Sequence, residues 1–301
     1  MENNEEKKQE QKKYRRRFGD RKDGRRVRSI TPMQRVSVYI MKTRNTSSNF
    51  FEDEIDTAAI DRYIKEKKDA GRKGFTIMHV LIASYIRAVS QYPALNRFIS
   101  GREVYARNDI QINLVIKKEM RLDEPDTAIK VHFTPDATAE EVYDKFTETI
   151  EQYRNAPGGS FDSAAKFLHY LPGFVLRAAI KLLSGLDYLG LLPTALTELS
   201  PFHGSFFITS MGSLGIPPIY HHLYDFGNVP LFMSFGAKEH RYELQADGST
   251  AKKTFVKYTV VMDERICDGY YYATSLKAMN RCYKNPWLLD ERPETVAEDQ
   301  P

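Results

Sequence analysis

The sequence predicts an α/β protein, a two-layer sandwich in which helices cover one mixed β-sheet. Three observations lead to this fold class. Helical periodicity prevails over residues 57–91, strand-like segments prevail over residues 205–262, and a helical pattern returns at 270–283. The chain has 301 residues, of which 42% are hydrophobic and 28% charged. It is therefore long enough to bury a substantial core, and we expect one large domain.

The first half is mainly helical. Residues 57–68 and 76–91 carry apolar side chains at helical spacing, and Tyr92-Pro93 ends the second helix. Residues 110–116 alternate between apolar and other side chains and predict a strand. Thr138 and Glu141 have the spacing of a capping box. The helix that they begin has an apolar stripe formed by Val142, Phe146, Ile150 and Tyr153.

The second half starts with a helical region and continues as strands. A small, flexible stretch at 158–160 precedes two predicted helices, at 163–170 and 173–183. Aromatic and β-branched residues then predict three strands, with Asp247-Gly248 as a hairpin turn before the last. These strands are 205–209, 231–237 and 254–262, and a helix at 270–283 closes the fold.

The positive charge is concentrated at the N-terminus. Residues 1–28 contain twelve lysines and arginines against six acidic residues, whereas the rest has 32 basic and 34 acidic residues. We expect a disordered basic arm at 1–28, one domain at 29–292 and a disordered tail at 293–301. The arm lacks the apolar core of a secretory signal peptide. A solvated tail is the preferred explanation of this arm, and binding of nucleic acid or an anionic membrane through phosphate contacts is the alternative.

Several classes of function are disfavoured. Cys267 and Cys282 provide neither a disulfide framework nor a metal site, so we expect no metal and a reducing cytoplasm. No phosphate-binding or dinucleotide-binding motif occurs. The most apolar stretch, residues 171–192, is interrupted by Arg177, Lys181 and Asp187, which disfavours a membrane span.

Two segments carry the clearest functional signal. Residues 204–212 read Gly-Ser-Phe-Phe-Ile-Thr-Ser-Met-Gly, and residues 263–269 read Asp-Glu-Arg-Ile-Cys-Asp-Gly. With Thr31-Pro32-Met33-Gln34-Arg35 near the start, they resemble the catalytic domain of dihydrolipoyl acyltransferases of 2-oxo acid dehydrogenase complexes. Chloramphenicol acetyltransferase is a more distant resemblance. The similarity covers about residues 29–290.

The resemblance implies a chloramphenicol acetyltransferase-like fold that forms a homotrimer. It implies coenzyme A or acyl-CoA as substrate, and an active site between subunits in which Thr209 of one chain faces residue 264 of another. No lipoyl domain or subunit-binding segment precedes the domain in this sequence, so no lipoyl group or standard dehydrogenase-complex partner is expected. A helical insertion at about 158–203 covers the core or alters the acceptor entrance.

The main departure from the family pattern is Glu264, which stands where the family has its catalytic histidine. With pKa values of about 8.5 for a thiol, 6.5 for histidine and 4.3 for glutamate, proton transfer is uphill by roughly 2.7 kcal/mol to histidine and 5.7 kcal/mol to glutamate. Burial could raise the pKa of Glu264 and make it a base. Alternatively, Arg265 could hold it in a structural ion pair.

The other candidates have supporting roles. Thr209 could donate its hydroxyl to an oxyanion, or bond its own backbone. Asp268 and Gly269 would shape the turn into the next helix. Cys267 is expected to be a buried small hydrophobe, and the histidine pair at 221 and 222 could supply a relocated base.

These observations predict an acyltransferase that binds an acyl-CoA thioester and transfers the acyl group to a small acceptor, with reduced or altered activity. The alternative is a catalytically inactive trimeric scaffold or regulator of the same fold.

Overall fold

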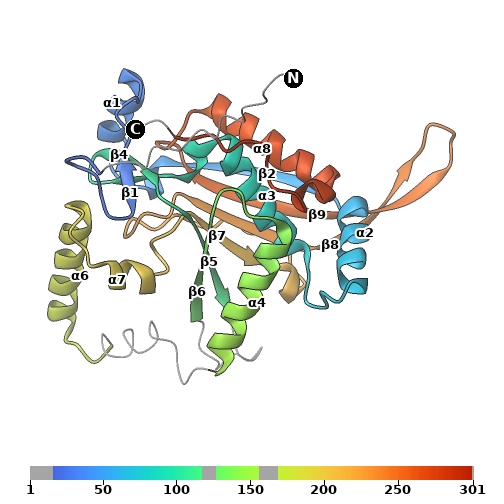
Figure 1. Cartoon of the computed structure of the whole chain (residues 1–301), viewed down its shortest axis with the longest axis horizontal. Helices are drawn as coiled ribbons and strands as arrows, with labels where there is room; N and C mark the ends of the chain where they lie inside the picture. The colour runs from blue at the N-terminus through green and yellow to red at the C-terminus, as the bar shows by residue number, and fades with distance from the viewer. Residues whose placement is uncertain (1–15, 117–126, 156–168, 300–301) are drawn as a thin grey trace, which may run out of the picture.

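The computed structural model describes residues 16–116, 127–155 and 169–299. At its centre is a six-stranded sheet in the order β2-β9-β8-β7-β5-β6 (Figure 1). The pairings of β7 with β5 and with β8 are parallel and the other three are antiparallel, so the sheet is mixed, as predicted. The strands are β2 (Ser48–Asp56), β5 (Ile110–Ile116), β6 (Thr127–Phe133), β7 (Phe206–Ser210), β8 (Leu231–Leu244) and β9 (Thr250–Asp263).

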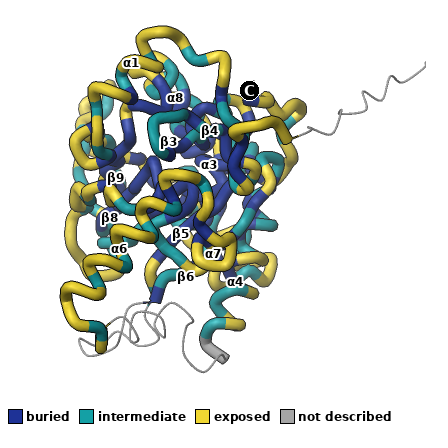
Figure 2. The backbone as a smooth tube through the Cα atoms, turned by 90° about the vertical axis from the view of Figure 1, so that its left-hand side faces the viewer, coloured by how far each residue is buried: buried dark blue, intermediate teal, exposed yellow. Residues whose placement is uncertain are grey.

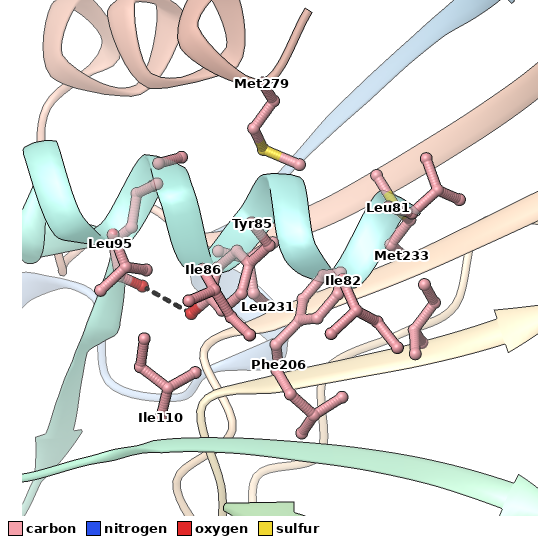
Figure 3. Close-up of a cluster of buried hydrophobic side chains, with 14 of the residues drawn as sticks. Leu81, Ile82, Tyr85, Ile86, Leu95, Ile110, Phe206, Leu231, Met233 and Met279 are labelled. Carbon is pink, nitrogen blue, oxygen red and sulfur yellow. Dashed lines mark hydrogen bonds between the residues drawn. The ribbon is translucent and has the colours of Figure 1, made fainter. Parts of the chain in front are cut away.

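Helices cover one face of this sheet. The central helix, α3 (Ile77–Gln91), is apolar on most of its circumference, because it packs against the sheet and also against the helices on either side of it, chiefly α8. Figure 3 shows Tyr85 and its neighbours on α3 pointing at Phe206 and Met233 of the sheet, with Met279 of α8 on the other side. The remaining helices of this layer are α2 (Ala58–Asp69), α4 (Ala139–Asn155) and α8 (Gly269–Lys284). The predicted two-layer fold is confirmed.

The opposite side of the sheet, which we call the open face, carries no helix layer. Because side chains alternate along a strand, Phe206 and Ile208 point into the main core and Phe207 points to the open face. There Phe207 and Phe232 stack with ring centroids 4.5 Å apart. The loop at 216–230 covers part of this face and adds Leu223 to the small apolar cluster.

Strands β8 and β9 are longer than predicted and continue beyond the sheet as a two-stranded hairpin (Figure 1). Paired charges support this extension. Lys253 Nζ lies 2.6 Å from Glu243, and Lys257 Nζ lies 3.0 Å from Glu239. Oppositely charged residues that face each other across the two strands stabilise the hairpin. Because these positions are polar, the sequence pattern does not predict them as strand.

The N-terminal segment differs from the prediction, because residues 16–28 are folded. Strand β1 (Gly24–Arg26) pairs with β4 (Glu103–Arg107), which also pairs with β3 (Arg97–Ser100) to form a small second sheet. Arg21 is buried and binds Asp23 and Asp187, each at 2.9 Å. Acidic partners elsewhere in the chain therefore hold basic residues that the sequence suggested were solvated. Residues 1–15 lie outside the described residues.

The C-terminal tail is also ordered as far as residue 299. The carboxylate of Asp299 forms two hydrogen bonds with Arg97, at 2.5 and 2.6 Å. The backbone N–H of Ala297 donates to the Ser90 carbonyl at 2.7 Å. The prediction of a disordered tail at 293–301 is therefore wrong for residues 293–299.

The predicted insertion contains α6 (Gly173–Tyr188) and α7 (Thr194–Leu199), which lie to one side of the sheet (Figure 1). Most of the helix predicted at 163–170 lies outside the described residues. A helix that the sequence did not predict, α1 (Pro32–Ile40), begins at the capping residue Thr31. None of the helices formed by the described residues is long and apolar enough to cross a membrane.

Candidate active site

Glu264 is the first residue after β9, and its side chain points to solvent. Its backbone N–H donates to the Ser47 carbonyl at 2.8 Å, which fixes the main chain at this point. Among the described residues its carboxylate has no ion-pair partner. The carboxylate of Glu264 is therefore available to a substrate or to another chain.

The ion pair expected between Glu264 and Arg265 does not form. Arg265 is buried and donates from Nε and Nη2 to the two carboxylate oxygens of Asp263, both at 2.8 Å. Arg44 also approaches Asp263, at 3.6 Å. Asp263 is the last residue of β9 and points into the interior. The Arg265 side chain lies in the interior beside it. Asp263, rather than Glu264, neutralises Arg265.

The rest of the turn is held firmly. The side-chain amide of Gln34 donates to the carbonyls of Arg265 and Ile266, at 3.2 and 3.1 Å. Ile266 and Cys267 are buried, and burial raises the pKa of Cys267 to about 12. Cys267 is therefore the buried small residue that was expected, with little thiolate character. Within residues 263–267, Glu264 alone is exposed.

Asp268 is the N-cap of α8. Its side chain accepts a hydrogen bond from the Tyr271 backbone N–H at 2.8 Å, which satisfies one of the free donors at the start of the helix. Gly269 is the first helical residue. Its backbone is not left-handed, and a β-carbon there would meet no atom within 4 Å. The conformation of this turn therefore does not require glycine.

Thr209 lies on β7 and points to the open face. It pairs in register with Ser234 on β8, which pairs with Thr259 on β9, so three hydroxyl residues form a row across the sheet. The Ile219 N–H donates to Ser234 Oγ at 3.2 Å, and Thr259 Oγ1 donates to the Ile219 carbonyl at 2.7 Å. The Thr209 hydroxyl has no hydrogen-bond partner among the described residues, so it can donate to a ligand.

One chain does not bring Thr209 and Glu264 together. The register places Thr209 opposite Ser234 and Ser234 opposite Thr259, and Glu264 follows Thr259 by five residues. At about 3.3 Å per residue and 4.8 Å per strand, the two positions are roughly 19 Å apart. A site that contains both residues therefore needs two chains.

A pocket of about 360 Å³ opens on the open face beside the hydroxyl row. It lies between β2 and the loop at 216–230, with Thr259 in its wall. Its other polar lining includes Glu52, Tyr220 and Lys257. The Tyr220 hydroxyl donates to Glu52 at 2.9 Å.

The two adjacent histidines have different environments. His221 is half-buried and stacks on Phe232 with ring centroids 4.1 Å apart, and burial lowers the pKa of His221. Its Nε2 is buried without a hydrogen-bond partner among the described residues. His222 is exposed beside Tyr224. In the part of the chain that the structure describes, no three acidic, histidine or cysteine side chains group as a metal site.

A buried polar cluster anchors the insertion to the domain. Asp187 at the end of α6 lies 2.9 Å from Arg21 and 3.3 Å from His203 Nε2. Burial opposes the charge on Asp187, but His203 and Arg21 outweigh it and hold the pKa of Asp187 below its ordinary value. Burial lowers the pKa of His203 despite this carboxylate. Arg107 lies deeper and donates to Asn228 at 2.8 Å.

A cavity of about 340 Å³ adjoins this cluster, with Arg21, Arg107 and His203 among its lining residues. No local pattern in the sequence predicts this cavity, because the cluster residues come from distant segments. Only the Arg21-Lys22-Asp23 run is local, and it suggested a solvated arm.

No family model matches the chain, and no curated protein matches it. Solved structures do. A probable dihydrolipoamide acetyltransferase from Listeria monocytogenes matches with a TM-score of 0.53 at 16% identity, over 85% of this chain and 92% of that one. A truncated catalytic core of the 2-oxoacid dehydrogenase multienzyme complex from Thermoplasma acidophilum matches with a TM-score of 0.52 at 14% identity, over 85% and 97%.

A third match is the dihydrolipoamide acetyltransferase of Azotobacter vinelandii, with a TM-score of 0.50 at 10% identity, over 85% of this chain and 88% of that one. At these identities the likeness establishes the fold. The chain has the fold of dihydrolipoamide acetyltransferase catalytic cores, as the sequence motifs predicted.

Proposed function

We propose that this chain with an acyltransferase fold binds an acyl-CoA thioester and transfers the acyl group to a small acceptor. In this proposal the protein acts as a homotrimer, and Glu264 of one copy faces Thr209 of the next. The observation that carries the proposal is the free carboxylate of Glu264, because Arg265 is neutralised by Asp263 instead. A glutamate locked to Arg265 could not accept a proton.

The separation of the two residues supports the requirement for a second copy. Thr209 and Glu264 are each presented outward, yet they are roughly 19 Å apart along one sheet. Phe50 and Tyr220 on the open face contact each other edge to face and remain exposed. A neighbouring copy that covered this surface would bury apolar area and supply the missing half of the site.

The proposed reaction is a direct acyl transfer. The acceptor's thiol, amine or hydroxyl attacks the thioester carbonyl carbon while Glu264 accepts its proton. The Thr209 hydroxyl donates a hydrogen bond to the oxyanion of the tetrahedral intermediate. When the intermediate collapses, the carbon–sulfur bond breaks and Glu264 returns the proton to the departing coenzyme A thiolate. The acyl group ends on the acceptor and free coenzyme A is released.

One solved structure with the same fold provides a comparison for the proposed base. The Azotobacter vinelandii structure addresses a serine, a histidine and an asparagine in the catalytic mechanism of that enzyme, and its histidine and asparagine are four residues apart. Glu264 and Asp268 have the same separation. With unperturbed pKa values, glutamate is a weaker base than histidine by roughly 3 kcal/mol in this transfer. Desolvation by the second copy would reduce that difference.

The test follows the release of free thiol from acetyl-CoA with a panel of thiol, amine and hydroxyl acceptors. We expect transfer above background, and a loss of about a hundredfold or more in Glu264→Gln, because a general base contributes about this much. Glu291→Gln, another exposed glutamate, is the matched control and should leave turnover unchanged.

Three outcomes would decide against this proposal. Unchanged turnover in Glu264→Gln would eliminate the base. If the native protein shows no transfer with any acceptor and Glu264→His creates it, the chain is a catalytically inactive scaffold of the same fold. Light scattering gives the mass of the assembly in both cases, and a monomer would contradict the shared site.

A further inference from the structure

Helix α6 leaves a large apolar surface uncovered. Most of its side chains are apolar, and Asp187 is its only buried residue. Phe174 is 78% exposed and Leu182 is 64% exposed. Tyr188, at the end of the helix, and the following Leu189 are also exposed. A helix with this composition is normally covered by another apolar surface.

The same surface continues over α1. Met33, Tyr39 and Ile40 on that helix are exposed. The turn between β3 and β4 joins the two helices: Arg102 donates to the Tyr39 carbonyl at 3.0 Å, and a β-carbon on Gly101 would lie 3.2 Å from the Tyr188 carbonyl oxygen. Figure 2 shows α1 and α6 on one side of the molecule, both largely exposed. We call this surface the α1–α6 face.

The exposed charges of α1 and α6 are basic. Arg177 and Lys181 are exposed on α6 and form no ion pair with another described residue. The one acidic residue of α6, Asp187, is buried and bound to Arg21. Residues 29–43 contain Arg35 and Lys42 and no acidic residue. The two helices therefore expose apolar side chains together with basic ones. No acidic residue on either helix neutralises these exposed basic side chains.

We infer that the α1–α6 face docks on an anionic lipid bilayer. Phe174, Leu182 and Leu189 would enter the boundary between headgroups and acyl chains, and Arg177 and Lys181 would contact lipid phosphates. At 16 residues α6 is about 24 Å long, shorter than the hydrocarbon core of about 30 Å. The helix therefore lies along the surface rather than across the membrane.

The mixture of charge and apolar area distinguishes this occupant from two others. A second copy that met this face with its own α1–α6 face would bring two sets of exposed basic side chains into one interface, without acidic residues of α1 or α6 to neutralise them. Nucleic acid would bind the basic side chains but leave Phe174 and Leu182 in water. An anionic bilayer satisfies both kinds of side chain.

The experiment is co-sedimentation of the full chain with two kinds of vesicle, one of phosphatidylcholine alone and one of an equal mixture of phosphatidylcholine and phosphatidylserine. We expect the mixed vesicles to bind at least about tenfold more strongly, and salt to weaken binding. Phe174→Glu with Leu182→Glu, and separately Arg177→Gln with Lys181→Gln, should each reduce binding about tenfold or more.

The matched control is Tyr242→Glu with Leu244→Glu on the distant β8–β9 hairpin. These residues are 74% and 77% exposed, so the control adds the same charge at comparable exposure. It should leave binding unchanged, and a thermal unfolding curve checks that each variant is folded. Equal vesicle binding by the α6 apolar variant would overturn the inference.

Two other results would assign the face to a different partner and so overturn the inference. If the α6 apolar variant reduces the mass of the assembly in light scattering and vesicles do not bind, the face joins copies of this chain. If duplex DNA binds, and binding is lost in Arg177→Gln with Lys181→Gln but not in the apolar variant, the face recognises nucleic acid.

Discussion

The two faces of the central sheet differ in what folding leaves available. On the face covered by helices, Tyr85 stacks on Phe206 with ring centroids 4.4 Å apart, and α3 packs against α8 in the same layer. On the open face, the Thr209 hydroxyl has no hydrogen-bond partner among the described residues and Phe50 is exposed. The covered face accounts for stability. The open face retains groups that can bind something else.

The largest expected effect tests this division of roles directly. Phe206→Ala removes a fully buried ring from the covered face, and the unfolding free energy should fall by about 3–5 kcal/mol. Phe50→Ala on the open face is the matched change, because Phe50 is 61% exposed, and it should cost less than about 0.5 kcal/mol. Urea denaturation measures both. Similar losses in the two variants would contradict the comparison.

A pH-dependent effect of intermediate size distinguishes two histidines. Burial lowers the pKa of His79 on α3 to about 4, whereas the unfolded chain has a value near 6.5. Between about pH 6.5 and pH 4, His79 binds a proton in the unfolded state but not in the folded state. Stability is therefore complete above about pH 6.5 and falls by up to about 3 kcal/mol as pH decreases to about 4.

His79→Gln should remove most of this pH dependence. Glutamine can keep the bond from the Thr76 N–H that His79 Nδ1 accepts at 3.0 Å, and it does not titrate. His221→Gln on the open face should change the pH profile less, because His221 is only half-buried. Urea midpoints between pH 4 and pH 8 give the profiles. If both variants keep the wild-type slope, His79 is not the group that titrates.

The smallest effect concerns the turn that leads from the sheet into α8. Asp268→Ala removes the N-cap bond to Tyr271 and should cost about 1 kcal/mol. Gly269→Ala should be neutral or stabilise by up to about 1 kcal/mol, since the site is open and not left-handed. Thermal unfolding resolves both. A marked destabilisation by Gly269→Ala would show that this position contacts something outside the chain, such as a neighbouring copy.

Much of the covered face could be predicted from the sequence, because its signals are local. The strand at 110–116 was predicted with the bounds observed for β5, and α2, α3 and α8 each lie within one residue of their predicted limits. Each of these helices and strands is buried along one side or almost completely. Their hydrophobic period therefore reports their structure directly.

The errors occurred where partners are distant in the sequence. The sequence suggests an ion pair between Arg265 and its neighbour Glu264, but Arg265 binds Asp263 at the end of β9 instead. Residues 16–28 were assigned to a solvated arm, because Asp187 and Glu103, which neutralise Arg21 and Arg26, are not local. The cavity beside Arg107 and His203 had no sequence signal for the same reason. Local patterns do not encode such long-range pairs.

The ion pair between Arg21 and Asp187 also has a consequence for biosynthesis. The two residues are 166 positions apart, so Arg21 leaves the ribosome long before its partner exists. At about 5–20 residues per second, this delay is roughly 10–30 s. The basic segment therefore spends that time on the nascent chain without its main buried partner. Its docking, and with it the anchoring of α6, must be a late step in folding that follows synthesis of more than half the chain.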